Sequence, residues 1–354
     1  MLYDYKHLCY LPLELWQTIL ELLDFYSQMK LKKINKYFYR NLEIVNLYEI
    51  PYQIQEKLKD DILKRFSRIK SLNLGFNSKV KDISHLTNLK RLNVGWNKKI
   101  TDESICKLDL VELTTGRNKN IGNITHLTNI RILHVKGDSP IDDQQIANLD
   151  LYELKANYNQ KITNISHLTN LKILQIKGIC GVTTIDNLDL IELTLSHNDN
   201  SFIFNKKNLT KLVVNGRFCT IGKNPNDIIK NPNLIELDVS YNTKITSLEN
   251  LTNLKILKAR GKCGIEDTTL IGLNLIDLDV QDNELVTDVN HLTNLKSLNA
   301  DGMCGIDDKG ILKLNLTQLI CGYNGLITTT SHLTNLKTTE GLREGYQYKS
   351  KMYY

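Results

Sequence analysis

The 354-residue sequence lacks several features that would identify a class of protein directly. It contains no run of about 18 apolar residues, so we expect no membrane-spanning helix, and its N-terminus lacks the basic and then apolar segments of a secretory signal. Charge of neither sign dominates, since 45 basic residues face 39 acidic ones, which argues against nucleic acid as the main partner. A Gly-rich phosphate loop, a zinc-protease motif, a paired CxxC and a nucleophile elbow are also absent. The sequence therefore predicts no enzyme and no cofactor.

What the chain does contain is a stretch of about 20 residues that recurs through most of its length. In the copy over residues 151–170, apolar residues occupy offsets 0, 3, 5, 11, 14 and 17, and Asn occupies offset 8. The pattern Leu-x-x-Leu-x-Leu-x-x-Asn at this period resembles leucine-rich repeats. The same frame starts at Ile69, Leu89, Leu110, Ile130, Leu151, Leu171, Leu190, Leu209, Leu234, Leu254, Leu275, Leu295 and Leu316, with a degenerate copy at Leu336.

This spacing predicts an α/β solenoid of about 13–14 coils with parallel strands on its concave face. The residues at offsets 3 and 5 alternate as in a strand and point into the solenoid. A single coil cannot bury its apolar edge, so neighbouring coils must stack into one continuous core. The Asn at offset 8, as in Asn159, is predicted to bond backbone groups where the chain leaves the strand.

Two types of coil alternate, which gives a longer period of about 41 residues. One type carries Asn at offset 8, and the other carries Gly at offset 7 and often Cys-Gly, as at Cys180, Cys263 and Cys304. Those cysteines lie in alternate coils, about 10 Å apart, which is too far for a disulfide. We therefore expect thiols and a reducing compartment. The same spacing separates the repeated His of the closing turn, as at His126 and His167, so we expect no metal site there.

Residues 8–48 do not follow the repeat. Leu15, Ile19, Leu22 and Leu23 form one helical stripe and residues 31–42 a second, with a break expected at Asp24–Gln28. The simplest interpretation is an N-terminal cap for the solenoid.

The order of residues in this segment resembles an F-box, from Leu11-Pro12-x-Glu14 to Phe38-Tyr39. An F-box followed by leucine-rich repeats is the arrangement of F-box/LRR ubiquitin-ligase receptors, and the Asn-, Ile- and Lys-rich composition is similar to the F-box/LRR proteins of amoebae and of their large DNA viruses. The resemblance implies that residues 8–48 bind a Skp-type adaptor and, through it, a cullin-RING ligase. The residues implied in adaptor binding are Leu11, Pro12, Glu14, Ile19, Leu20, Leu23, Leu31, Ile34 and Phe38.

Four regions follow from these patterns. Residues 8–48 form the F-box and residues 49–68 a helical connector that covers the first coil. Residues 69–335 form the solenoid, in which residues 222–233 are an insertion, interpreted first as a tolerated surface loop and alternatively as a binding loop. Residues 336–354 form a degenerate last coil and a tail.

Residues outside the repeat frame are the candidates for binding a target. Offset 7 carries large side chains that the coil does not require, and aromatic residues and Arg often dominate protein interfaces. Offset 4 changes from basic to acidic along the chain. The predicted target-binding residues on the concave face are Trp96, Arg117, His134, Lys155, Tyr158, His197, Asp238, Tyr241, Asp279 and Tyr323. The alternative interpretation of this face is a solvated surface whose cross-strand pairs serve stability.

The sequence thus predicts the non-enzymatic substrate-recognition subunit of a Skp-cullin-F-box ubiquitin ligase, located in the cytoplasm, or in the host cytoplasm if the protein is viral, with the nucleus as a second compartment. Its partners would be the adaptor and an unidentified target protein, with neither nucleic acid nor membrane. Two alternatives stay open. One is a leucine-rich-repeat interaction module whose N-terminal helices are only a cap, and the other is a secreted adhesin built from similar short coils.

Overall fold

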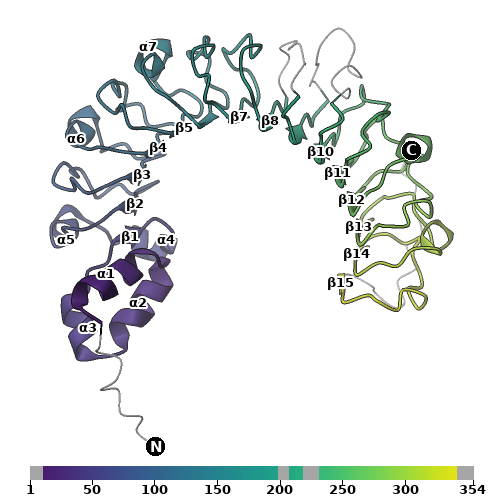
Figure 1. The fold of residues 1–354 in the computed structure, drawn as a ribbon, viewed down its shortest axis with the longest axis horizontal. Coiled ribbons are helices and arrows are strands. Elements are labelled where there is room, and N and C mark those ends of the chain that lie inside the picture. The colour runs from purple at the N-terminus through teal and green to yellow at the C-terminus, as the bar shows by residue number, and fades with distance from the viewer. Residues whose placement is uncertain (1–10, 198–206, 218–230, 341–354) are drawn as a thin grey trace, which may run out of the picture. The chain divides into compact units, whose positions relative to one another are not determined.

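The computed structural model describes residues 11–197, 207–217 and 231–340, with side chains described up to residue 337. The chain divides into two compact units, Met1–Thr163 and Asn164–Tyr354. Helices occupy the N-terminal part of the first unit, and short parallel strands follow one another in both units (Figure 1). No helix in the described part is long and apolar enough to cross a membrane.

The first unit begins with three helices and continues with six strands. The helices of the N-terminal module are α1 (Leu13–Glu21), α2 (Phe25–Lys33) and α3 (Lys36–Asn41). The shorter helices are α4 (Tyr52–Gln55), α5 (Asp60–Leu63), α6 (Asp102–Ile105) and α7 (Asp143–Ile146). The strands are β1 (Asn46–Leu47), β2 (Ser71–Asn73), β3 (Arg91–Asn93), β4 (Glu112–Thr114), β5 (Ile132–His134) and β6 (Glu153–Lys155).

The second unit contains strands β7 (Ile173–Gln175), β8 (Glu192–Thr194), β9 (Lys211–Val213), β10 (Glu236–Asp238), β11 (Ile256–Lys258), β12 (Asp277–Asp279), β13 (Ser297–Asn299), β14 (Gln318–Ile320) and β15 (Thr338–Glu340). Two 3₁₀ helices, Asp267–Leu270 and Lys309–Ile311, lie between its strands. Within each unit every strand pairs in parallel with the next one along the chain. This is the predicted leucine-rich-repeat solenoid, with one strand in each coil.

The repeat places the same offset of every coil in the same layer of the core. Leu92 aligns with Leu113, and Leu113 with Leu133. In the coil that starts at Leu151, all six apolar positions are buried: Leu151, Leu154, Ala156, Ile162, Ile165 and Leu168. Some coils also contain one short helical turn, as in α6 and the 3₁₀ helix Lys309–Ile311.

The Asn at offset 8 joins adjacent coils, as predicted. Asn159 is fully buried. Its side-chain oxygen accepts hydrogen bonds from the backbone N–H of Lys161 at 2.8 Å and of Ile162 at 3.0 Å, and its Nδ2 donates to the carbonyl of Ile141 in the preceding coil at 3.3 Å. The amide thus pairs polar backbone groups that are removed from water on both sides of the coil interface.

The N-terminal module differs from the prediction in where its helices end. The break expected at Asp24–Gln28 lies at residues 22–24, because the Asp24 side chain accepts the backbone N–H of Ser27 at 3.0 Å and so starts α2. The second stripe is not one helix. The Asn35 side chain accepts the backbone N–H of Phe38 at 2.7 Å and starts α3 as a separate helix.

The connector at residues 49–68 is not one covering helix. β1 pairs with β2 in the repeat register, with Asn46 opposite Ser71 and Leu47 opposite Leu72. The short helices α4 and α5 follow, and Leu58 and Leu63 are buried while Ile54 is exposed. The segment is thus an additional first coil, whose strand lies inside the region assigned to the F-box.

The cysteines of the described part carry thiols rather than disulfides. Cys180, Cys263, Cys304 and Cys321 are buried and Cys106 is exposed. Burial raises the pKa of the Cys304 and Cys321 thiols to about 11. These thiols are therefore protonated, poorly nucleophilic core residues.

Candidate functional site

The N-terminal module has its own hydrophobic core, and this core separates the predicted adaptor-binding residues into two groups. Leu20, Leu31 and Phe38 are buried in it, and Leu23 packs against it. These four side chains hold the helices together. The five that face solvent are Leu11, Pro12, Glu14, Ile19 and Ile34.

Helix α1 is apolar on two sides. Trp16 and Leu20 face the core of the module, where the rings of Trp16 and Phe38 lie 4.7 Å apart. The opposite side carries a second apolar stripe in which Leu22 is 83% exposed. This exposed stripe consists of Leu11, Leu15, Ile19 and Leu22. Sequence reasoning grouped three of its members but did not show that they point away from the core.

Two buried glutamines attach the module to the first coil. Gln28 Nε2 donates to the carbonyl of Leu23 at 2.7 Å, and Gln28 Oε1 accepts the backbone N–H of Val45 at 3.1 Å, next to β1. Gln17 exchanges two hydrogen bonds with the backbone of Glu43, at 3.0 and 2.9 Å. The module is therefore hydrogen-bonded to the start of the solenoid and not only tethered to it.

The predicted column at offset 7 lies just past the carboxyl end of each strand, and its backbone is left-handed at most of its members, though not at Tyr323. The φ angles are 63° at Trp96, 59° at Arg117 and 59° at Tyr158. In the coils of the other type, Gly fills this position with the same φ, for example 64° at Gly137. Non-Gly residues seldom adopt this conformation. The aromatic members are exposed, namely Phe76, Trp96, Tyr158, Tyr241 and Tyr323.

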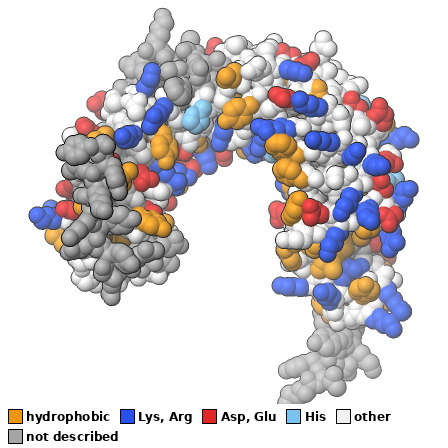
Figure 2. Space-filling view, turned by 180° about the vertical axis from the view of Figure 1, so that it is seen from behind, with side chains coloured by type: hydrophobic (Ala, Val, Ile, Leu, Met, Phe, Trp, Pro, Cys, Tyr) orange, Lys and Arg blue, Asp and Glu red, His pale blue; other side chains and the backbone are white. Residues whose placement is uncertain are grey.

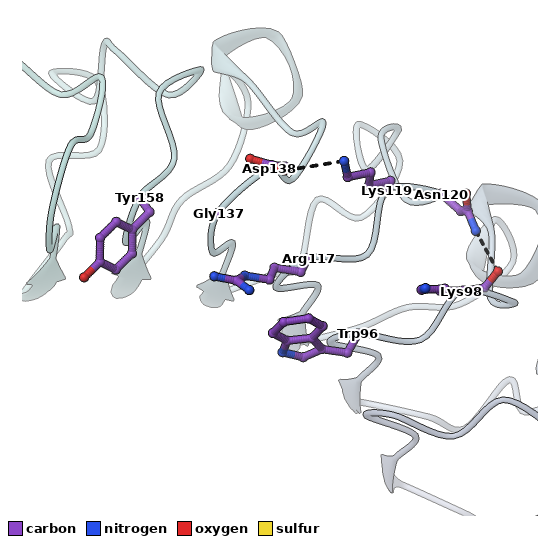
Figure 3. Close-up of a pocket in the computed structure, with 8 residues that line it drawn as sticks. All are labelled: Trp96, Lys98, Arg117, Lys119, Asn120, Gly137, Asp138 and Tyr158. Carbon is purple, nitrogen blue, oxygen red and sulfur yellow. Dashed lines mark hydrogen bonds and ion pairs between the residues drawn. The ribbon is translucent and has the colours of Figure 1, made fainter.

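Three consecutive members of this column form a stack in the first unit. The rings of Phe76 and Trp96 lie 5.5 Å apart and within 18° of parallel. The guanidinium carbon of Arg117 lies 4.5 Å from the centre of the Trp96 ring on the next coil, a cation–π distance. The next coil carries Gly137 in the column. Figure 3 shows Trp96 and Arg117 one over the other, and Tyr158 beyond Gly137.

A hollow of about 830 Å³ lies beside this stack. Its lining consists of Trp96, Lys98, Arg117, Lys119, Asn120, Gly137, Asp138 and Tyr158. Lys119 pairs with Asp138 at 3.4 Å, and Asn120 donates to the carbonyl of Lys98 at 2.9 Å (Figure 3). Sequence reasoning found Trp96, Arg117 and Tyr158 but missed the lysines, although Lys98 and Lys119 share offset 9 in consecutive coils.

The strand face of the first unit carries paired charges, and two predicted residues belong to them. Glu153 accepts hydrogen bonds from Lys155 at 2.5 Å and from Nε2 of His134 at 2.9 Å. Burial lowers the pKa of His134 and outweighs the effect of Glu153, while Lys155 and His134 lower the pKa of Glu153 against its own desolvation. The imidazole is therefore neutral at pH 7. In the tautomer that fits its partners, the N–H at Nε2 donates to Glu153, and Nδ1 faces the hydroxyl of Thr114 at 3.3 Å.

A second network on the same face escaped sequence reasoning. The Tyr48 hydroxyl donates to Glu112 at 2.9 Å, Arg91 contacts the same carboxylate at 2.6 Å, and the Arg91 guanidinium lies 3.6 Å from the centre of the Tyr48 ring. Burial and the charge of Glu112 raise the pKa of Tyr48 to about 12. This network crosses β2 and stabilises the first coils.

In the second unit the predicted acidic residues are hydrogen-bonded to neighbouring side chains. Asp279 is buried and accepts two hydrogen bonds from Arg260, one of them from Nε at 2.7 Å. Asp238 accepts from Asn215 at 3.0 Å. Asp279 therefore offers little surface to a partner. The remaining predicted residues, His197, Tyr241 and Tyr323, are exposed.

Figure 2 shows hydrophobic side chains along one edge of the first unit, with Lys and Arg side chains among them. In the described residues no group of three or more His, Cys, Asp or Glu side chains could hold a metal ion.

Comparison with known proteins supports the fold alone. No protein-family model and no curated protein matches the sequence significantly. Among solved structures, the chain is similar to an internalin (InlF) from Listeria monocytogenes, with a TM-score of 0.50 and 21% identity over 81% of this chain and 92% of the internalin. The Rad7–Elc1 complex of yeast has a TM-score of 0.48 and 17% identity, covering 82% and 86% of the two chains. The Leptospira interrogans LRR protein LIC12759 has a TM-score of 0.46 and 21% identity, covering 84% and 88%.

Proposed function

We propose that this protein is a substrate receptor of a Skp-cullin-F-box type ubiquitin ligase. The N-terminal module would bind the adaptor, and the solenoid would hold a target protein at the column of offset 7 and the adjoining strand face. The receptor would be non-enzymatic and would act by proximity, because it brings target lysines close to a ubiquitin carrier held by the same complex. The buried thiols favour a reducing compartment such as the cytoplasm.

The exposed apolar stripe on α1 is the observation that carries this proposal. A helix that only capped the solenoid would need one apolar side, and the side formed by Trp16 and Leu20 already meets that need. Leu15 and Ile19 remain exposed on the other side. Contiguous exposed apolar surface of this kind marks interaction sites, and its position within the F-box-like segment points to the adaptor.

The stripe can be tested without disturbing the core. The double substitution Leu15→Asp with Ile19→Asp places charges on the exposed side only, so the module should keep its helical circular dichroism. We expect co-purification of a Skp-type adaptor from a eukaryotic lysate to fall at least tenfold. Tyr52→Asp, an exposed position outside the module, is the matched control and should retain the adaptor.

Two outcomes would contradict the proposal. If the double variant keeps the adaptor, the stripe does not bind it. If the unmodified protein captures no adaptor at all, the alternative of an interaction module without a ligase role gains support, and the N-terminal helices are then a cap.

A further inference from the structure

We propose that the hollow beside Gly137 binds one aromatic side chain of the target protein, presented by a segment rich in acidic residues. This inference deepens the proposed function and rests on it only in that the target is a protein. It names the chemistry that the first unit would recognise.

The column itself defines a position for a flat group. Phe76, Trp96 and Arg117 stack at separations of 5.5 and 4.5 Å, which is close to the spacing of neighbouring coils. Gly137 interrupts the series, and Tyr158 resumes it on the following coil. Adjacent strands are about 4.8 Å apart, so two coils separate Arg117 from Tyr158 by about 10 Å. One planar ring fits between groups at that separation.

The lining of this space is suited to an aromatic ring. The outer side of the Arg117 guanidinium offers a planar cation, and such groups stack on aromatic faces. Tyr158 is 56% exposed and offers a second ring. The hollow of about 830 Å³ lies within the range of roughly 300–1,000 Å³ typical of ligand pockets.

The charge around the hollow selects an acidic partner. Three cations line it, Lys98, Arg117 and Lys119, against the single carboxylate of Asp138. Asp138 pairs with Lys119. In the described part of the chain no ion pair involves Lys98 or Arg117, so both can meet carboxylates on either side of an inserted ring. Complementary charge of this kind fixes the register in which the partner binds and increases the rate of association.

A single strand of nucleic acid fits these observations less well. Proteins that bind single-stranded nucleic acid offer several successive stacking positions and a continuous basic groove. Within the described residues of the first unit, the offset-7 column has one Gly gap, at Gly137. The neighbouring strand face also carries Glu112 and Glu153, which oppose a phosphate chain.

The probe is a synthetic peptide with one Phe flanked on each side by two acidic residues. The sequence has two Trp, and Trp16→Phe leaves Trp96, which lines the hollow, as the only Trp, so its fluorescence can be excited selectively over that of Tyr. The indole N–H of Trp16 has no hydrogen-bond partner in the described structure, so this change removes none. We expect the peptide to change Trp96 fluorescence in a saturable manner at micromolar to millimolar concentrations.

Two altered peptides and two protein variants test the geometry. Replacing Phe by Ala, or the acidic residues by their amides, should each weaken binding at least tenfold. Gly137→Asn should do the same, because Asn tolerates φ of +64° and its side chain fills the gap. A Cβ there stands 3.3 Å from the flexible Arg117 side chain, which can give way, so the variant should fold. Lys79→Gln, an exposed turn position outside the hollow, is the control and should bind normally.

Three results would overturn the inference. The first is equal binding of the Ala peptide, and the second is unchanged binding by a folded Gly137→Asn variant. The third is tighter binding of single-stranded oligothymidine than of the acidic peptide. Failure of this inference is distinguishable from failure of the proposed function, because adaptor capture and target capture from a lysate are measured separately and do not depend on the peptide.

Discussion

The ring of Tyr241 lies over Gly261 of the next coil, so closely that a Cβ built on Gly261 would stand 2.2 Å from Cε1 of the tyrosine. Gly216 has the same relationship to His197, at 2.6 Å. A ring that covers the next coil in this way leaves room only for Gly at offset 7 of that coil. Phe76, Trp96 and Arg117 instead stack on one another in consecutive coils, so the contact accounts for the Gly that follows Tyr241 and His197.

The first prediction concerns this contact. Gly261→Ala should destabilise the second unit by more than the cost of a left-handed residue alone, which is about 1–2 kcal/mol, because the new methyl group also meets Tyr241. Chemical denaturation measures the change in the free energy of unfolding. Adding Tyr241→Ala should restore part of the lost stability, because it removes the clash between the tyrosine ring and the new methyl group. The strain of a left-handed Ala at position 261 would remain.

Two other glycines separate the cost of the left-handed backbone from the cost of the steric contact. Gly272 has φ of +84° and nothing within 4 Å of a built Cβ, so Gly272→Ala should show the backbone cost alone. Gly325 also has open space and no left-handed φ, so Gly325→Ala should be nearly neutral. If Gly261→Ala costs no more than Gly272→Ala, the contact with Tyr241 is not the reason for Gly at position 261.

The second prediction concerns the buried Asn at offset 8. Asn159→Ala should lower stability by about 1–3 kcal/mol, because the backbone N–H of Ile162 and the carbonyl of Ile141 lose their partner while they stay buried. The Asn123 side chain bonds only to Thr125 in its own exposed turn, so Asn123→Ala should change stability by about 0.5 kcal/mol or less. An unchanged melting curve for Asn159→Ala would mean that water replaces the amide.

The third prediction is a dependence of stability on pH. Burial depresses the folded-state pKa of His134 below its ordinary value of 6.5, so the unfolded chain binds a proton more readily than the folded one. The contribution of His134 to folding stability is therefore fully present above pH 6.5 and is lost as the pH drops below that value. Glu153, whose folded pKa is also lowered, adds a loss that begins below its ordinary value of 4.5.

The substitution His134→Gln isolates the histidine contribution. It should flatten the dependence of the unfolding free energy on pH between about 7 and 5, within the range where the unfolded imidazole titrates. His126, in a closing turn, keeps a single backbone contact to the Ile105 carbonyl at 3.2 Å, and His126→Gln serves as the control. A pH profile for His134→Gln that equals the parent profile would contradict the assignment.

The fourth prediction concerns thiol reactivity. Cys106 is exposed and should react with an alkylating reagent in the native protein. Cys304 and Cys321 should react roughly 100-fold more slowly even where reagent reaches them, since a pKa of about 11 in place of 9.0 leaves about a hundredth of the thiolate. Mass spectrometry of native and denatured samples measures both. A disulfide between Cys263 and Cys304 would overturn the expected separation of alternate coils.

The fifth prediction concerns target binding by the column of offset 7. Trp96→Ala with Tyr158→Ala should leave the free energy of unfolding within about 1 kcal/mol of the parent, because both side chains are exposed. The double variant should lose a captured target and keep the adaptor. A variant that folds and still captures the target would place the target surface elsewhere, with the insertion at residues 222–233, most of which lies outside the described residues, as the next candidate.

Much of the fold follows from the sequence alone, because the repeat records it at short range. Leu151, Leu154 and Ala156 are spaced as an inward-facing strand requires, and all three are buried. Asn159 has to satisfy backbone groups in its own turn, and it does so. Such features depend on residues within about ten positions of each other and recur at a fixed spacing along the chain, so the repeat pattern identifies them.

The helical module shows where that short-range reading ends. Its stripes predict helical structure, although the second stripe spans two helices, and apolar spacing alone does not show which side of α1 faces the core. Leu20 and Ile19 are adjacent and both apolar, and only packing against Phe38 and Leu31 buries the first and leaves the second exposed. Likewise, β1 is too short to recognise until it pairs with β2.

Only the tertiary structure decided how side chains one coil apart meet. Arg117 stacks on Trp96, and Tyr241 covers Gly261, across about 20 residues of sequence. The sequence determined that offset 7 carries a large residue or Gly, whereas the stacking of coils determined that one lies on the other and that the hollow beside Gly137 stays open. The physical reason is that a repeat fixes positions within a coil, while contacts between coils depend on the size of the neighbour's side chain.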